Sequence, residues 1–209
     1  MQTIILKNKP SLKGTACIVG KKENDGNLSK YFDAVILDGR YGRKSWEEAE
    51  SEMQKSASYM LLKKTDKSAE EIDFLFGGDL LNQCMGTSFG ITKLNIPFFG
   101  IYGACSTFCE GMILSSILVD GGYGKNIICT SSSHFCTSER QFRFPLEYGG
   151  QRAPSAQWTV TGAGAALISD EECEIRITAV TPGKVVDLGI TDAANMGAAM
   201  APVDVKLTP

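Results

Sequence analysis

Cys105 is the residue of this sequence whose position best suits chemistry. It follows Gly103-Ala104, which suits a tight turn, and it stands where an apolar helix over 108–119 should begin. Backbone N–H groups and the helix dipole at such a position stabilise a thiolate. The position suits an activated nucleophile or a hydrogen-bonding group in an anion pocket. A buried structural cysteine is the alternative, because most free cysteines pack in protein cores.

Three other polar residues are candidates for the same site. His134 is the single histidine of the chain. It has no second histidine beside it to act as a base for Cys105, and a histidine held by loop hydrogen bonds is the alternative. Asp79 and Asn82 follow an expected parallel strand, and ligands of open α/β sheets gather at the carboxyl ends of strands. A helix cap or turn is the alternative role for Asp79.

An arginine- and aromatic-rich segment over 140–152 contains Arg140 and Arg143. The guanidinium fork binds carboxylates in a bidentate manner, so a dicarboxylate ligand would suit this segment. The alternatives are ion pairs within the loop, such as Arg140 with Glu139 or Glu147, or a subunit interface.

The elements that must position these residues alternate along the chain. A capping-box pattern from Ser45 to Glu48 predicts the start of a helix with an apolar face. Two further helices are expected over 87–94 and 108–119, the second apolar nearly all round and therefore buried. Strands are expected over 15–20, 72–76, 97–101, 126–130, 159–169 and 174–181, with an irregular stretch over 131–157. This alternation predicts an α/β layered fold with a mostly parallel sheet.

Composition excludes several classes of protein. The 209 residues carry a formal net charge of -3, which argues against electrostatic binding to nucleic acid. No apolar run is long enough to span a bilayer, and the first residues lack the features of a signal peptide. Seven cysteines, an odd number, fit free thiols in a reducing compartment. Because they lack the close paired spacing of zinc ligands, no metal site is expected.

At these motifs the sequence resembles the stage V sporulation protein AD family of the thiolase superfamily. The resemblance rests on Gly78-Asp-Leu-Leu-Asn-Gln83, on the segments 99–107, 139–151 and 159–165, and on later matches up to Pro202. It implies a thiolase-like layered fold and covers the first half of a pseudo-symmetric repeat. Residues 1–182 would form the N-terminal thiolase-like half, and residues 183–209 would begin an incomplete second half. We therefore expect a truncated chain.

The resemblance also implies a function. It implies binding of dipicolinic acid, with calcium accompanying the ligand and no other cofactor, for uptake into the developing spore. It implies a non-catalytic pocket, because the histidine and asparagine that condensing enzymes pair with their cysteine are not in this chain. The expected ligand-binding residues are Cys105, His134, Asp79, Asn82, Arg140 and Arg143.

The expected cellular location, partners and oligomeric state follow from the same resemblance, as do the alternative functions. We expect a peripheral protein at the cytoplasmic face of the forespore inner membrane, with other stage V sporulation membrane proteins as partners. We also expect a homodimer in which 126–130 pairs with its symmetry mate. One alternative is a ketoacyl-synthase-like acyltransferase with Cys105 as nucleophile. Another is a half-chain that needs a second polypeptide to complete its fold.

Overall fold

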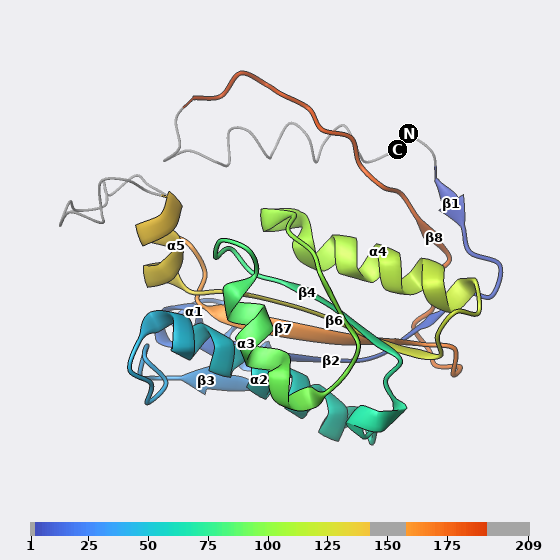
Figure 1. Cartoon of the computed structure of the whole chain (residues 1–209), viewed down its shortest axis with the longest axis horizontal. Coiled ribbons are helices and arrows are strands. Elements are labelled where there is room, and N and C mark those ends of the chain that lie inside the picture. The colour runs from blue at the N-terminus through green and yellow to red at the C-terminus, as the bar shows by residue number, and fades with distance from the viewer. Residues whose placement is uncertain (1–2, 143–157, 192–209) are drawn as a thin grey trace.

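A six-stranded sheet forms the centre of the protein. The computed structural model describes residues 3–142 and 158–191 (Figure 1). The main sheet has the strand order β3-β2-β7-β6-β4-β5, and β1 pairs with β8 apart from it. The strands are β1 Ile4–Ile5, β2 Ser11–Gly20, β3 Ala34–Ile36, β4 Phe74–Gly78, β5 Phe98–Gly100, β6 Asn126–Ser133, β7 Gly162–Ser169 and β8 Ala179–Val180. The helices are α1 Lys21–Asn24, α2 Trp46–Thr65, α3 Met85–Ile91, α4 Thr107–Asp120 and α5 Phe135–Phe142, with 3₁₀ turns at Ser29–Tyr31, Ala69–Glu71, Thr92–Leu94 and Ala104–Ser106.

The main sheet is mostly parallel, as the alternation of elements predicted. The pairings of β2 with β3, of β4 with β5 and of β4 with β6 are parallel. Only β7 runs in the opposite direction, between β2 and β6. The central strands are covered on both faces, which explains why they read as continuous apolar runs in the sequence.

Two helices cover opposite faces of this sheet (Figure 1). Met53 and Leu61 of α2 pack in one core with Ile128 of β6. The neighbouring residue Ile127 lies in the second core, under Met112 of α4. Successive residues of a strand point to opposite faces, so β6 supplies both cores.

Helix α2 begins as its sequence predicted. Ser45 Oγ accepts a hydrogen bond from the Glu48 N–H at 3.1 Å. In a full capping box the Glu48 side chain would accept a hydrogen bond from the Ser45 N–H. Here Glu48 Oε2 accepts from the Lys44 N–H instead, at 3.0 Å. The helix ends at Thr65, and Asp66 follows in the left-handed conformation at φ 52°, a common way to end a helix.

The prediction that α4 is buried all round is only partly correct. Its buried positions carry mainly small residues, among them Gly111, Ser115 and Ser116. A Cβ built on Gly111 would lie 3.0 Å from the Cys129 Cβ of β6, so the helix lies very close to the sheet. The larger residue Ile113 is partly exposed. The apolar profile therefore belongs to a helix with one face on the sheet and the other only partly covered by the described residues.

Three other expectations about elements need correction. The stretch after position 130 is not irregular at its start, because β6 continues to Ser133 and α5 follows. Residues 174–181 do not form a strand of the main sheet; only β8 is a strand there, and it pairs with β1. The short strand β3 was not predicted. After β8, residues 183–191 are exposed and carry no helix or strand.

Candidate functional site

The loops after β4 and β5 form one continuous site. Gly78, the last residue of β4, lies against the backbone of Ile101 so closely that a Cβ there would collide with the Ile101 carbonyl oxygen. The same Cβ would lie 2.7 Å from Thr107 Cγ2 at the start of α4. Because the obstacle is backbone, only glycine fits. The Gly103 N–H donates to Thr107 Oγ1 at 3.1 Å, which fixes the turn between β5 and α4.

Cys105 lies in this turn, and its side chain is exposed. The prediction of a strand–helix junction is confirmed, and the described residues do not bury Cys105 in a core. Ala104, immediately before it, has a φ of 48°, in the left-handed region that residues other than glycine rarely adopt. Gln83 and Cys84, in the loop after β4, are also left-handed, at φ 62° and 57°. Strained backbone of this kind clusters at functional sites, which supports this edge of the sheet as the site.

Asp79 caps a helix and holds a turn, which was the expected alternative to a role in ligand binding. It is 2% exposed, and its Oδ1 accepts from the Leu81 N–H at 2.8 Å. Its Oδ2 accepts from both the N–H and the Oγ1–H of Thr87 at 2.6 Å. Asp79 therefore shapes its own loop and the first turn of α3. Asn82 lies exposed on the same loop.

His134 is bound to Gly39 and Cys136. It is buried, and its Nε2–H donates to the Gly39 carbonyl at 2.8 Å, while Nδ1 accepts from the Cys136 N–H at 3.2 Å. Its ring lies 5.2 Å from that of Trp46, the first residue of α2. Burial lowers the pKa of His134, so the neutral ring is favoured. Because both ring nitrogens of His134 have partners elsewhere, neither nitrogen is directed at the Cys105 thiol.

The arginine-rich segment is only partly described. Arg140 falls within α5, but its side chain lies outside the described residues, as does Arg143. The start of α5 is well anchored, because the Phe135 ring stacks on Trp158 with 3.5 Å between centroids. Lys22 Nζ lies 3.3 Å from the centroid of the Trp158 ring.

Sequence reasoning missed a buried carboxyl group, Glu50 of α2. Its side chain is completely buried, and burial raises its pKa to about 7, with a smaller contribution from the charge of Asp79. The signal was present: Glu50, Gln54 and Ser58 follow one another at four-residue spacing beside the apolar stripe of α2, and all three are buried. Polar residues that recur at helical spacing next to a core face indicate a buried polar contact.

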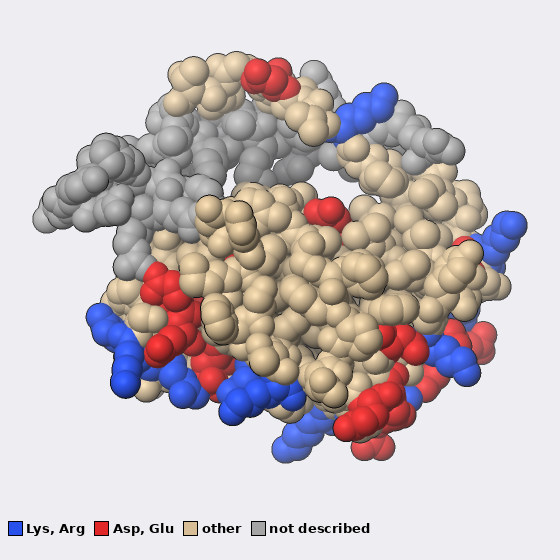
Figure 2. Space-filling model, in the orientation of Figure 1, with Lys and Arg blue, Asp and Glu red and all other residues tan. Residues whose placement is uncertain are grey.

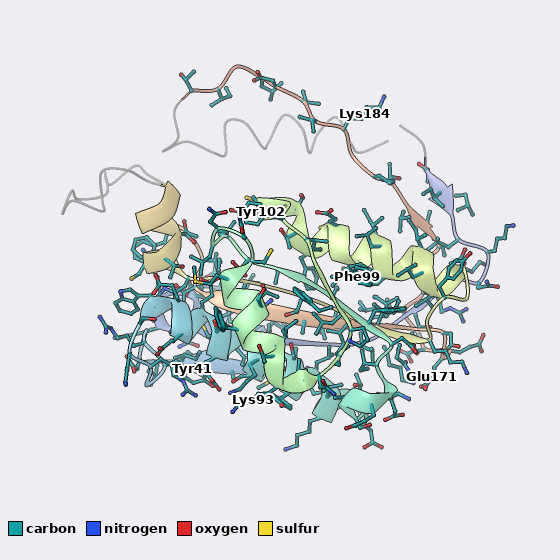
Figure 3. All side chains as sticks on the ribbon, viewed as in Figure 1. Tyr41, Lys93, Phe99, Tyr102, Glu171 and Lys184 are labelled. Atoms are coloured by element: carbon teal, nitrogen blue, oxygen red, sulfur yellow. The ribbon has the colours of Figure 1, made fainter. Side chains whose placement is uncertain are left out.

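The edges of the main sheet correct one expectation about dimers. β6 is paired with β4 on one side and with β7 on the other, so it cannot pair with a symmetry mate. Among the strands formed by residues 3–142 and 158–191, β3 and β5 are at the edges of the sheet. Near β5, Phe89, Phe99 and Tyr102 are 74%, 49% and 50% exposed. Figure 3 labels Phe99 and Tyr102, and Figure 2 shows few charged side chains on this face, over α3 and α4.

Residues 3–142 and 158–191 contain neither a cluster of metal ligands nor a membrane-spanning helix. No three histidine, cysteine, aspartate or glutamate side chains converge there as ligands for a metal ion. None of the helices in that part of the chain has the length and apolarity needed to cross a membrane.

The fold defines a class of protein. The chain is similar to 3-oxoacyl-[acyl-carrier-protein] synthase III from Aquifex aeolicus, with a TM-score of 0.52, 15% sequence identity, and coverage of 79% of this chain and 55% of that one. It is also similar to a variant of OleA from Xanthomonas campestris, with a TM-score of 0.53, 15% identity, and coverage of 79% and 57%. These structures place the chain among proteins with the thiolase-like fold.

Within that class the sequence identifies a family. The family model of stage V sporulation protein AD matches residues 1–208 of this chain. The chain is 44% identical over 201 residues to stage V sporulation protein AD of Bacillus subtilis, which covers 96% of this chain and 60% of that protein. This chain therefore belongs to the stage V sporulation protein AD family, and it spans 60% of the length of the curated relative that it matches.

Proposed function

We propose that this chain, whose family gives it a role in sporulation, contributes a non-catalytic pocket for dipicolinate. Calcium would enter with the ligand, and the protein would serve the uptake of calcium dipicolinate into the developing spore. The observation that carries the proposal is the exposed Cys105 turn at the positive end of α4, with no histidine beside it.

The turn suits an anion for two reasons. The amino-terminal end of a helix favours negative charge, and α4 runs for 14 residues from Thr107. Cys105 is exposed at that end, and Tyr102 adds a partly exposed ring on the same loop, with its hydroxyl 3.3 Å from the Leu80 carbonyl oxygen. Dipicolinate is a flat aromatic dianion, so positive potential beside an aromatic wall matches both of its features.

Calcium enters this proposal as part of the ligand. Both carboxylate oxygens of Asp79 already accept hydrogen bonds from Leu81 and Thr87. Asp79 would have to give up these bonds to bind a cation, so its role in the pocket is to hold the loop that carries Asn82.

Acyl transfer by Cys105 is the second candidate function. The exposed thiol and the strained backbone of Ala104 favour it, since both are found at catalytic nucleophiles. The position of His134 counts against it, because a thiol nucleophile is activated by a base within hydrogen-bond reach. Incubation with acyl thioesters, followed by mass spectrometry of Cys105, tests this candidate. Turnover that is abolished by Cys105→Ser would establish it in place of the binding function.

Calorimetric titration with dipicolinate, with and without calcium, tests the binding function. Both this chain and its full-length relative should be titrated. Isophthalate, which has the same two carboxylates without the ring nitrogen, is the matched ligand. We expect heat of binding for dipicolinate that Cys105→Phe weakens and that Cys109→Phe, one turn further along α4, leaves nearly unchanged. Equal affinity of the full-length protein and its Cys105→Phe variant would place the pocket elsewhere.

The cellular location, the partners and the oligomeric state belong to the same proposal. A peripheral position at the forespore inner membrane, with other stage V sporulation membrane proteins as partners, fits the family role. A homodimer would use the free edge of β5, where Phe99 is half exposed. Edge strands with exposed apolar side chains favour pairing with a second chain.

A further inference from the structure

A buried polar cluster lies where α2, β6 and α5 meet. Glu50 and Gln54 of α2, Ser132 of β6 and Thr137 of α5 are each 8% exposed or less. Glu50 Oε1 lies 3.0 Å from Ser132 Oγ, and Glu50 Oε2 lies 2.8 Å from Thr137 Oγ1. Ser132 Oγ is also 3.3 Å from Gln54 Oε1, and Thr137 Oγ1 is 2.9 Å from the His134 carbonyl oxygen.

The number of protons in this cluster is too small if Glu50 is ionised. Each of the two hydroxyls lies between two acceptor oxygens, but each has only one proton to donate. Two of the four contacts would then bring oxygen lone pairs together without a hydrogen. At the same time the Gln54 Nε2 is buried without a hydrogen-bond partner. Unpaired polar groups in a low-dielectric interior are costly, so this arrangement is unfavourable.

One added proton and one amide rotation satisfy all four contacts. With the Gln54 amide turned by half a rotation, Nε2–H donates to Ser132 Oγ, and the Ser132 hydroxyl donates to Glu50 Oε1. A proton on Glu50 Oε2 is donated to Thr137 Oγ1, and the Thr137 hydroxyl donates to the His134 carbonyl. The two orientations of a glutamine amide have nearly the same shape, and its oxygen and nitrogen are assigned from such networks, so the rotation needs no repacking. It leaves Gln54 Oε1, in place of Nε2, at the position that has no partner among the described residues.

We propose that Glu50 carries a structural proton that closes a hydrogen-bond chain from α2 through β6 to α5, and that loss of this proton releases α5. This role of Glu50 is independent of the ligand that the protein binds.

The charges around Glu50 favour the neutral form. Asp79, from the loop after β4, is the charged group that acts on it from the described residues, and it has the same sign. A Cβ built on Gly86 of α3 would lie 3.3 Å from Asp79 Oδ2 and 3.6 Å from the Glu50 carboxyl carbon, so the two carboxyl groups flank one glycine. α3 has no charged residue, β6 and α5 contribute the hydroxyls of Ser132 and Thr137, and His134 is favoured neutral. Burial is the main cause that raises the pKa of Glu50, to about 7; the charge of Asp79 adds to it, while the hydrogen bonds to Thr137 and Ser132 act in the opposite direction.

The consequence is a pH-dependent anchor for α5. The pKa of Glu50 is higher in the folded protein than its ordinary value of 4.5, so the folded state binds the proton more tightly. Stability from this group is therefore complete below pH 4.5, is lost as the pH rises to about 7, and stays low above that. The last residues of α5 are also the first residues of the arginine-rich segment over 140–152. Protonation of Glu50 would therefore hold the start of that segment in place.

Hydrogen–deuterium exchange of the peptide over 132–142, corrected for the intrinsic pH dependence of exchange, tests the proposal. In the wild-type protein, protection of the α5 amides should fall by up to about tenfold per pH unit between pH 4.5 and about 7, and then level off. Glu50→Gln keeps the shape of the side chain but cannot ionise, so its protection should not change across this window. Glu172→Gln, at an exposed glutamate, should behave as the wild type.

A wild-type profile without this slope, or a Glu50→Gln profile with the same slope, would overturn the proposal. If Glu50→Gln does not fold, infrared titration of the wild-type protein decides the question without a variant. A protonated-carboxyl band that disappears with a midpoint near 7 supports the structural proton, and absence of such a band above pH 5.5 rules it out.

Discussion

Lys67 Nζ lies 2.6 Å from Glu171 Oε1 and joins the end of α2 to the segment after β7. Lys13 Nζ of β2 lies 2.9 Å from the other carboxylate oxygen of Glu171. The hydrogen bond from Lys67, and then that from Lys13, lowers the pKa of Glu171 to about 2. The stability from these pairs is therefore present above the ordinary pKa of 4.5 and is lost as the pH falls towards 2.

Glu171→Gln should lower the free energy of unfolding by at most about 1 kcal/mol at neutral pH, because the Glu171 side chain is 42% exposed and solvent screens the pairs. Urea unfolding of wild type and variant at pH 7 and pH 3, at low and high salt, measures this difference. The difference should shrink in acid and in salt. Glu172→Gln, whose side chain is 87% exposed, is the control and should show a smaller effect.

Gly78→Ala should destabilise the protein by roughly 1–3 kcal/mol, as other overpacking substitutions do. The added methyl group would meet the Ile101 carbonyl, which is backbone and can move only with the turn before α4. Urea unfolding measures the loss, and the reaction rate of Cys105 with a thiol reagent should change with it. Gly183→Ala is the matched control, because nothing lies within 4 Å of a Cβ there. Equal stability of the two variants would contradict the tight packing of β4 against β5.

The sequence predicted the sheet well where a strand is buried on both faces. Ile127 and Ile128 of β6 are both completely buried, and their continuous apolar run predicted the strand correctly. β3 was missed because it is short and only one of its three residues, Ile36, is fully buried. The segment over 174–181 was wrongly predicted as a full strand, because alternation alone cannot reveal that Ile175 is 58% exposed and that pairing with β2 is limited to an isolated bridge between Arg176 and Ser11.

The candidate site around Cys105 could be predicted only in part, because some of its features are local in the sequence and others depend on contacts between distant residues. The junction at Cys105 follows from local features, a glycine turn before an apolar helix, and local features can be read from the chain. The partners of His134 include Gly39, 95 positions earlier in the chain, and such a contact depends on the order of the strands in the sheet. The Glu50 cluster joins residues 87 positions apart, from Glu50 to Thr137. Such pairings cannot be read from local patterns.

Exposed and buried cysteines should differ in their rate of reaction with N-ethylmaleimide. Cys105 and Cys109 are exposed and should be modified first. Cys129 is buried between the sheet and α4, and burial raises its pKa to about 12, so very little thiolate is present. Mass spectrometry of peptides over a time course gives the order. Dipicolinate should slow the modification of Cys105 more than that of Cys109, and equal slowing of the two would place the ligand elsewhere.

Phe99→Lys should weaken the proposed dimer. Phe99 is on the edge strand β5, where its ring stacks on Phe76 at 5.1 Å between centroids and is 49% exposed. A charge on an edge strand opposes pairing with another chain. Sedimentation across micromolar concentrations measures the change in dissociation constant. Tyr123→Lys, at a 75% exposed ring after α4, is the control. A wild-type chain that stays monomeric throughout would remove the basis of this prediction.

Arg143→Ala should weaken dipicolinate binding by about ten- to a hundredfold, because a charge-assisted contact to a carboxylate contributes about 1.5–3 kcal/mol. Arg143 follows α5 directly, and the first turn of α5 is anchored by Thr137 and by the stacking of Phe135 on Trp158. The helix that precedes Arg143 is therefore fixed in place, and Arg143 itself lies outside the described residues.

Calorimetric titration of the full-length relative measures the loss of affinity, and Arg176→Ala is the control. The Arg176 side chain bonds the carbonyls of Lys9 and Asn8 near the start of β2, so its loss should leave affinity unchanged. If Arg143→Ala binds as tightly as the wild type while its fold is intact, the arginine-rich segment does not bind the ligand through this residue.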